Sequence, residues 1–148
     1  MANVIKLRKG LDVNLKGKAA KEEFQVKKPA VYALVPDDFT GMKPKVVVKE
    51  NDVVKVGDSL FVDKNHPEIK FVSPVRGRVT MVERGDRRKV LSVRVEADAE
   101  QQYVDFGKKN VGQMTAQEVK DLLLESGLFG FFRQRPYDVT ANPSDTPK

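Results

Sequence analysis

The chain has 148 residues, with 27 Lys and Arg against 21 Asp and Glu, which gives a formal net charge of +6. More than half of its Leu, Ile, Val and Phe residues are Val, and this composition favours strands and supports a buried core. Cysteine is absent, which excludes disulfides, a thiol nucleophile and Cys-ligated zinc or iron–sulfur sites. A single histidine, His66, excludes a multi-histidine metal centre and disfavours histidine-based catalysis. We expect no metal site and no catalytic residue in this portion.

The first 28 residues form a region of their own in our interpretation. The N-terminus has no apolar core of a secretory signal, and the chain has no run of 18 apolar residues, so we expect no transmembrane segment of its own. A first short strand is expected at Val4, Ile5 and Leu7. Alternation of apolar and polar residues from Leu11 to Leu15 predicts a half-buried strand. The stretch 16–28 is expected to be an exposed connection.

Residues 29–98 contain short apolar runs separated by turn residues. The spacing is typical of a small barrel or sandwich. In the last run, alternation places Val90, Ser92 and Arg94 on one face, against Leu91, Val93 and Val95 on the other. The predicted strands are 31–35, 44–48, 60–62, 69–72, 79–82 and 89–96.

Residues 99–148 differ in character from the region before them. Thr115 followed by Glu118 is a capping box, and Val119, Leu122 and Leu123 form an apolar stripe that predicts a helix over 115–127. The stripe requires a partner surface. The aromatic and basic segment that follows, together with the polar tail, indicates the start of a truncated second domain.

Two turn motifs carry a resemblance to a known fold. Gly57-Asp58 permits a chain reversal, and Ser73-Pro74 followed by Gly77 ends one strand and allows a kink before the next. Over residues 43–96 this pattern resembles the half-repeats of biotinyl and lipoyl domains. The expected fold is therefore mainly β, a barrel-sandwich hybrid, followed by a capped α-helix and the start of an α/β domain.

The ordered motifs of the whole chain resemble one family more specifically. They are Gly10-Leu11-Asp12, the stretch Tyr32–Pro44, Leu60–Lys64, Phe71–Gly77, Arg84–Arg88, Glu125–Leu128 and Arg133–Tyr137. In this order they resemble the A subunit of the bacterial Na⁺-translocating NADH:quinone oxidoreductases, whose chains are much longer. A related electron-transport complex that feeds ferredoxin has a similar domain.

The resemblance implies a role within a membrane complex. The subunit is expected to be peripheral, on the cytoplasmic side of the bacterial inner membrane, with the other subunits of the complex as its partners. The complex couples NADH oxidation and ubiquinone or other quinone reduction to Na⁺ export. This chain is expected to carry no cofactor, while NADH, flavins, an iron–sulfur centre and quinone belong to the assembled complex.

The aromatic and basic segment near the C-terminus is the candidate for a quinone-proximal site. Aromatic rings can pack around a flat quinone, and arginines can donate to its carbonyl oxygens. The alternative, which we favour, is hydrophobic docking onto another domain. The stretch Leu34–Met42 is a weaker candidate for the same role, and a plain strand and turn is the preferred interpretation there. The quinone-proximal candidates are Phe131, Phe132, Arg133, Arg135 and Tyr137.

Two alternatives from other functional classes stay open. Asp63-Lys64 lies where lipoyl domains carry their modified lysine, but the loop is longer and contains His66-Pro67, so an ordinary loop lysine is favoured. A small β-barrel could also bind nucleic acid through its arginines. Aromatic residues do not interleave with that group as stacking requires, so we expect no nucleic-acid partner. Arg84-Gly85-Asp86 is interpreted as a hairpin turn. The basic group is Arg76, Arg78, Arg84, Arg87, Arg88 and Lys89.

Overall fold

The computed structural model describes residue 10 and residues 16–146. The two strands predicted before residue 16, at Val4–Leu7 and Leu11–Leu15, lie outside the described residues. Within the described part of the chain, no helix is both long and apolar enough to cross a membrane. The predicted exposed connection is confirmed, since residues 16–28 have no regular secondary structure and are all exposed.

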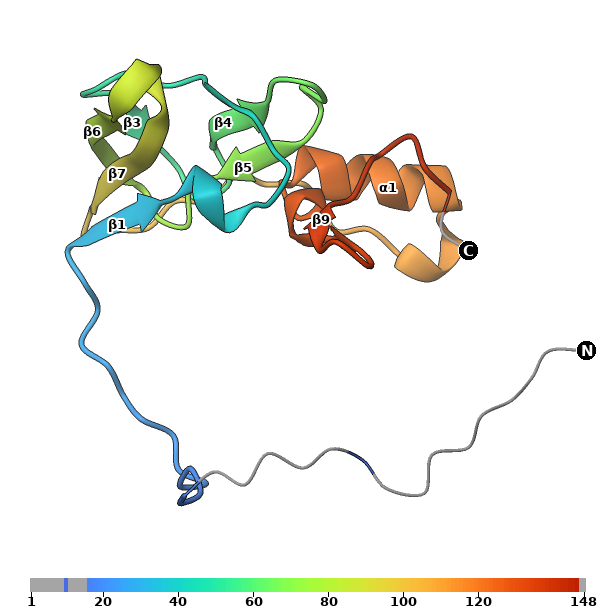
Figure 1. Ribbon diagram of the computed structural model, residues 1–148, viewed down its shortest axis with the longest axis horizontal. Coiled ribbons are helices and arrows are strands. Elements are labelled where there is room, and N and C mark those ends of the chain that lie inside the picture. Colours follow the sequence, from blue (N-terminus) through green and yellow to red (C-terminus); the bar gives the residue numbers. More distant parts are fainter. Residues whose placement is uncertain (1–9, 11–15, 147–148) are drawn as a thin grey trace, which may run out of the picture.

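The β domain consists of two antiparallel sheets in the described residues (Figure 1). The four-stranded sheet has the order β1-β7-β6-β3, and the three-stranded sheet has the order β2-β4-β5. The predicted strands are confirmed, although β1 and β2 end earlier than expected and β3 is not among the predicted strands. Pro36 begins a 3₁₀ turn just after β1. The bounds are β1 (Val31–Leu34), β2 (Pro44–Val46), β3 (Val53–Val54), β4 (Ser59–Asp63), β5 (Lys70–Val72), β6 (Gly77–Arg84) and β7 (Val90–Ala97).

The core lies between these sheets and consists mainly of valine and phenylalanine side chains. Stiff β-branched residues pack well on a pleated sheet, which explains why a Val-rich sequence builds this domain. Phe129, from outside the β domain, is part of the same cluster. The buried residues are Phe39, Val54, Leu60, Phe61, Ile69, Phe71, Val75, Val79, Val90, Val93, Val95 and Phe129.

The predicted alternation along β7 is wrong at one point. Val90 is buried with Val93 and Val95, whereas Leu91 is exposed. The cause is a β-bulge, because Glu83 pairs with Ser92 and the next residue of β6 pairs with Val90, so Leu91 has no partner in the register. A bulge shifts the side-chain phase, and simple alternation cannot predict that shift.

Two successive turns in the β domain share one hydrogen-bond pattern. In the turn Lys55–Asp58, the N–H of Asp58 donates to the carbonyl of Lys55 at 3.1 Å, and the Lys55 N–H donates to the Asp58 carboxylate at 2.7 Å. The turn Lys49–Asp52 repeats both bonds. Asn51 and Gly57 occupy the third positions with φ of 74° and 97°. The predicted chain reversal at Gly57-Asp58 is therefore confirmed, and the Asp58 carboxylate closes it by accepting from a residue that precedes it.

Gly77 is required for a reason other than the predicted kink. It begins β6 between β3 and β7, where it pairs with Val54 and Ala97. A Cβ atom at this position would lie 1.8 Å from the Glu96 carbonyl oxygen. The position therefore excludes every side chain because the neighbouring backbone approaches too closely.

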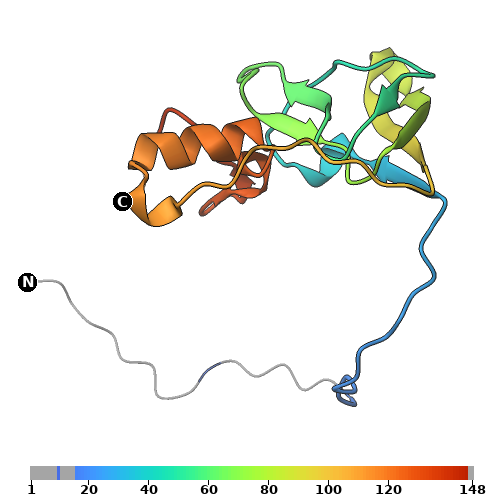
Figure 2. The ribbon, with the colours of Figure 1, turned by 180° about the vertical axis from the view of Figure 1, so that it is seen from behind.

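The segment after β7 returns along the β domain before the helix begins (Figure 2). Val56 donates to the Gln102 carbonyl and accepts from the Val104 N–H, both at 2.9 Å, as a parallel bridge to Tyr103. The Arg76 N–H donates to the Gln101 side chain at 2.8 Å. The connection to the helix is thus attached to the β domain by backbone hydrogen bonds.

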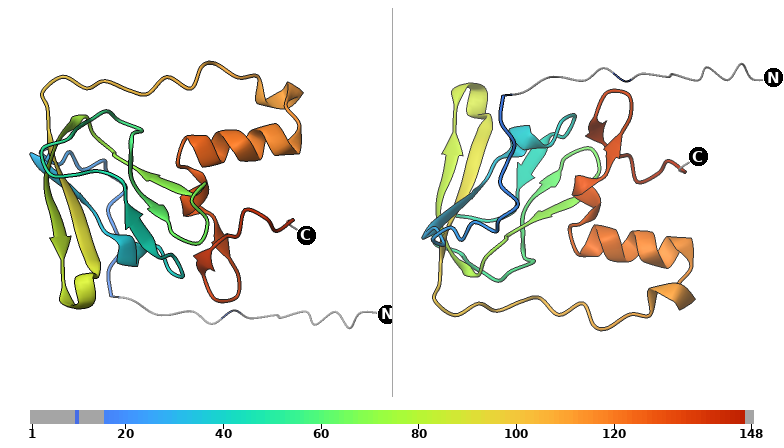
Figure 3. Two further views of the ribbon diagram at one scale, coloured as in Figure 1. Left: turned by 90° about the horizontal axis from the view of Figure 1, so that it is seen from above. Right: turned by 90° about the horizontal axis from the view of Figure 1, so that it is seen from below.

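The predicted helix is confirmed as α1 (Ala116–Glu125). Thr115 and Glu118 form the full capping box, since each side chain accepts a hydrogen bond from the backbone N–H of the other. A 3₁₀ turn, η3 (Val111–Gln113), precedes the helix. A second 3₁₀ turn, η4 (Phe129–Phe131), and a hairpin of β8 (Arg133–Gln134) and β9 (Val139–Thr140) follow it (Figure 3).

Candidate functional site

Phe39 joins the C-terminal segment to the core of the β domain. Its buried ring lies 4.4 Å from the ring of Phe71 and 6.4 Å from that of Phe61, measured between centroids. On its other side, the ring of Phe131 packs edge-on at 5.5 Å. The aromatic cluster therefore continues from the β domain into η4 without interruption.

Arg133 is held at the same junction by two contacts. Its Nη2 donates to the carbonyl oxygen of Asp38 at 2.7 Å, and its Cζ lies 5.7 Å from the centre of the Phe39 ring. The cationic guanidinium over the aromatic face is an attractive arrangement. Its Nη1 is buried and has no hydrogen-bond partner among the described residues. Arg133 thus has one buried nitrogen, with two N–H groups, that lacks a hydrogen-bond acceptor beside the aromatic cluster.

Backbone contacts complete the junction. The Thr140 N–H donates to the Thr40 carbonyl at 2.9 Å, and the Ala141 N–H donates to the Phe132 carbonyl at 2.9 Å. The stretch Leu34–Met42 and the segment around β8 and β9 are therefore one structural unit. In the sequence they are two separate candidates, and only the fold brings them together.

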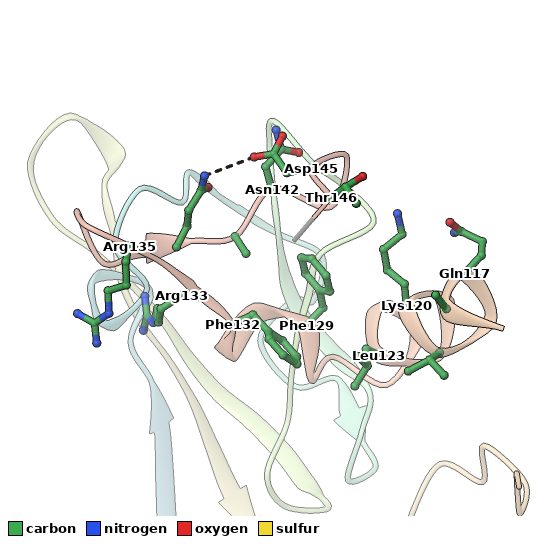
Figure 4. Close-up of a pocket in the computed structure, with 14 residues that line it drawn as sticks. Gln117, Lys120, Leu123, Phe129, Phe132, Arg133, Arg135, Asn142, Asp145 and Thr146 are labelled. Carbon is green, nitrogen blue, oxygen red and sulfur yellow. Dashed lines mark hydrogen bonds between the residues drawn. The ribbon is translucent and has the colours of Figure 1, made fainter. Parts of the chain in front are cut away.

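A groove of about 1010 Å³ lies between α1 and the segment that follows it (Figure 4). One wall is the apolar stripe of the helix, and the other comes from η4, β8 and the chain after β9. Sequence reasoning identified the stripe but not the groove, because only the tertiary contacts place the two walls opposite each other. Its apolar lining is Ala116, Val119, Leu123, Phe129, Phe132 and Ala141, and its charged lining is Lys120, Arg133, Arg135 and Asp145.

The five predicted quinone-proximal residues take different places around this groove. Phe132, Arg133 and Arg135 line it. Phe131 packs on Phe39, with 61% of its surface exposed, and Tyr137 is 82% exposed on the hairpin. The Arg135 guanidinium lies 3.6 Å from the carboxylate of Asp138. The structure therefore gathers three of the five around one groove.

The polar groups of the groove differ in how they are engaged. Lys120 Nζ donates to the Pro143 carbonyl at 2.9 Å, and Gln134 contacts the Asp145 carboxylate at 3.5 Å. The Arg133 Nη1 is the buried donor that these contacts leave unsatisfied in the described structure. Nη1 is covered by protein atoms, so an oxygen acceptor would reach it only if the side chains around it moved.

Lys64 lies at the beginning of the β4–β5 loop. Its backbone N–H donates to the Lys43 carbonyl at 2.7 Å, and the turn at the tip is closed further along, where the Ile69 N–H donates to the His66 carbonyl. The preceding Asp63 is only 4% exposed, and its carboxylate accepts from the N–H groups of Lys43 and Asn65. The loop is thus held at its base, where Lys64 is located, and the tip is formed by other residues.

Two members of the basic group of the β domain form ion pairs in the structure. Arg76 lies 3.4 Å from the Asp98 carboxylate, and Lys89 lies 2.6 Å from that of Asp37. Arg84-Gly85-Asp86 leaves β6 and enters the turn to β7, so the predicted hairpin turn is confirmed.

Comparison with known protein families assigns both parts of the chain. Residues 5–98 match the model described as the NqrA N-terminal barrel-sandwich hybrid domain. Residues 114–148 match the model described as the NqrA second alpha/beta domain. The expected fold class is therefore confirmed, because the mainly β domain matches the family's barrel-sandwich hybrid domain. The predicted helix lies in the second matched region.

Several curated proteins are similar to nearly the whole chain. Each is named as the A subunit of a Na(+)-translocating NADH-quinone reductase. The protein of Yersinia pseudotuberculosis serotype O:1b is 34% identical over 149 residues, covering 98% of this chain and 33% of the relative. That of Pseudomonas aeruginosa strain UCBPP-PA14 is 33% identical over 147 residues, covering 97% and 33%. That of Haemophilus influenzae strain PittEE is 34% identical over 136 residues, covering 90% and 30%.

The chain spans about a third of the length of the curated relatives it matches. The first family model covers well over half of the chain, and the second begins just before α1. The Phe39–Arg133 junction lies where the two matched regions meet, whereas the groove is lined only by residues of the second. The chain belongs to the NqrA family, with the family's N-terminal barrel-sandwich hybrid domain over residues 5–98 and a match to its second α/β domain over residues 114–148.

Proposed function

We propose that this chain acts within the NqrA component of a Na⁺-translocating NADH:quinone oxidoreductase, as a peripheral subunit on the cytoplasmic side of the bacterial inner membrane. Family membership and the names of the relatives support this proposal. The complex oxidises NADH, reduces a quinone such as ubiquinone and exports Na⁺. Flavins and an iron–sulfur centre belong to its other subunits, and this chain contributes no cofactor.

The proposed role of this portion is structural, in assembly near the quinone-reduction end. The groove beside α1 is the observation that carries it. α1 lies wholly within the described residues and has an apolar stripe, yet none of its residues is buried. Burial of apolar surface contributes about 25 cal/mol per Å². Packing of further polypeptide, such as the rest of an α/β domain, into the groove would therefore bury this apolar surface and stabilise the folded protein.

Quinone contact at the same groove is the second candidate, and the unsatisfied Arg133 Nη1 favours it. A quinone carbonyl oxygen would accept from this donor once the side chains that cover Nη1 move aside, and the Phe132 ring lines the groove as an apolar surface. Arg135 also lines the groove, whereas Phe131 and Tyr137 are not among its lining residues. In this arrangement, Arg133 binds and orients the quinone and stabilises negative charge on its oxygen during reduction.

The complex itself is tested by affinity capture. The full-length tagged protein is purified from membranes in mild detergent, and the co-purifying chains are identified by mass spectrometry. Recovery of flavin-bearing membrane subunits with Na⁺-stimulated NADH:quinone activity supports the proposal. A protein that purifies alone with added mass on Lys64 indicates a carrier domain instead, and one that brings down nucleic acid indicates a binding barrel.

The two candidates for the groove are separated by Arg133→Ala in the intact complex, with Arg78→Ala as a matched control on an exposed residue of β6. Quinone contact predicts that Arg133→Ala slows quinone reduction more than NADH oxidation by artificial acceptors. A packing role predicts equal effects on both activities, or a lower yield of complex. Arg78→Ala is expected to leave all three measurements unchanged.

A further inference from the structure

The turn that joins β6 to β7 lies at one end of the β domain (Figure 3). Residues 84–89 contain four basic side chains and one acidic side chain, Asp86. Lys89 is neutralised by Asp37, at 2.6 Å. Arg84, Arg87 and Arg88 are exposed, and none of the three forms an ion pair within the described part of the chain. Three uncompensated guanidinium groups therefore lie within five residues.

The backbone of the turn holds two of these arginines in an unfavourable conformation. Arg87 has φ of 53° and Arg88 has φ of 62°, both in the left-handed region that favours Gly, Asn and Asp. Hydrogen bonds between Gly85 and Lys89, at 2.8 Å, and between Lys89 and Asp86, at 3.1 Å, close the turn in this shape. Arginine at both positions costs stability, and such strain is frequently retained where a side chain binds something.

The third arginine is directed toward the same place. Arg84 Nη1 lies 3.5 Å from the Arg88 carbonyl oxygen, so its side chain extends across the turn. Three like charges on one short turn repel each other, and an anionic surface with several phosphates would compensate them. The arrangement thus favours a polyanionic partner over solvent.

The neighbouring side chains distinguish a lipid surface from a nucleic acid. Leu91 is 37% exposed, and it lies against Gly85, whose Cβ would be 3.1 Å from Leu91 Cδ1. No aromatic residue occurs between Phe71 and Tyr103, so β6, β7 and their turn offer no platform for base stacking. Arginines beside an exposed aliphatic residue are typical of contact with phospholipid headgroups and the adjacent acyl boundary.

We propose that the β6–β7 turn, through Arg84, Arg87, Arg88 and Leu91, docks on a membrane surface that contains anionic phospholipid. The contact goes beyond the proposed function and does not involve the groove. It would orient the β domain on the membrane independently of contacts with other subunits. If the complex does not form, the membrane contact can still be tested and can still be present. If the membrane contact is absent, the proposed function is unaffected.

The test is co-sedimentation of the full chain with vesicles of phosphatidylglycerol and phosphatidylcholine in equal parts, compared with phosphatidylcholine alone. The test variant combines Arg84→Gln, Arg87→Asn and Arg88→Asn, because Asn tolerates a positive φ. Each basic residue beside an anionic surface contributes roughly fivefold to partitioning, so the variant is expected to bind about 100-fold more weakly. The wild-type chain is expected to bind mixed vesicles and not phosphatidylcholine.

The matched control removes the same charge from the exposed connection, with Lys18→Gln, Lys21→Gln and Lys27→Gln. It is expected to retain most of the binding. Equal losses in the two triple variants would show that only net charge matters, and this overturns the proposal. So does a wild-type chain that binds no vesicles, or one that binds RNA through the same arginines and not lipid. If the triple variant does not fold, the pair Arg87→Asn and Arg88→Asn replaces it, with an expected loss of roughly 25-fold.

Discussion

The guanidinium carbon of Arg133 lies 5.7 Å from the centre of the Phe39 ring, and its Nη2 donates to the carbonyl of the adjacent Asp38. Phe39 is part of the β-domain core, and Arg133 lines the groove beside α1. One contact therefore links the stability of the barrel-sandwich hybrid domain to the geometry of the candidate site. Substitutions at Phe39 are expected to alter both.

Phe39→Ala is expected to lower the free energy of unfolding by about 3–5 kcal/mol, because it removes a buried ring that contacts Phe61, Phe71 and Phe131. Urea denaturation followed by far-UV circular dichroism measures the change. Phe24→Ala is the matched control, since that side chain is 88% exposed, and its effect is expected within about 0.5 kcal/mol. Similar effects of the two substitutions would contradict the position of Phe39 in the core.

Gly130→Ala tests how closely η4 packs on the β domain. A Cβ at Gly130 would lie 2.7 Å from Cε1 of Phe71, so the ring or the turn must move. Overpacking of this kind is expected to cost about 1–3 kcal/mol of stability.

Gly112→Ala is the control, because its nearest neighbour would be 3.5 Å away, at an exposed position in η3. Thermal unfolding of both variants is the measurement. A Gly130→Ala variant with the same melting temperature as the wild type would show that η4 does not pack against Phe71.

The capping box of α1 predicts a pH dependence. Hydrogen bonding by the Thr115 backbone N–H, and then by its hydroxyl, lowers the pKa of Glu118 below its ordinary value of 4.5. The carboxylate is therefore favoured in the folded state, and its stabilisation is present above pH 4.5 and is lost as the pH falls through the lower folded pKa. The helical signal of α1 is expected to decrease over that acidic range.

Glu118→Gln removes the titrating group, so it is expected to flatten this dependence in a circular dichroism titration. Glu125→Gln, at the other end of the same helix, is the control and is expected to leave it unchanged. If the wild type and Glu118→Gln give the same titration curve, the pH dependence of α1 does not arise from Glu118.

A second carboxyl group with a lowered pKa is that of Glu83, which pairs with Ser92 across β6 and β7. The hydrogen bond from Ser92 Oγ, at 2.8 Å, and then that from Arg94, at 2.7 Å, lower the pKa of Glu83. Ser92→Ala is therefore expected to raise the pKa of Glu83 toward 4.5, as measured by NMR titration of the side-chain carboxyl carbon. Arg78→Gln, on the same strand, is the control. A pKa that Ser92→Ala leaves unmoved would mean that Arg94 alone determines it.

Features that depend on neighbours along the chain could be predicted from the sequence. The capping box of Thr115 and Glu118 spans one helical turn, and the turns that precede Asp52 and Asp58 span four residues each. Valine-rich runs between such turns indicated the strands and the fold class. These interactions form between residues a few positions apart, so the local order of residue types contains the information that they require.

The bulge at Leu91, the close backbone approach at Gly77 and the groove beside α1 were decided only by the tertiary structure. Each depends on which strand pairs with which, and in what register, and long-range pairing is not encoded in local periodicity. The same holds for the junction at Phe39. By itself, the sequence determined a Val-rich β domain, a capped amphipathic helix and a set of aromatic and arginine candidates. The fold decided which of those candidates meet, because packing of the Phe71 and Phe39 rings against η4 sets the position of Arg133.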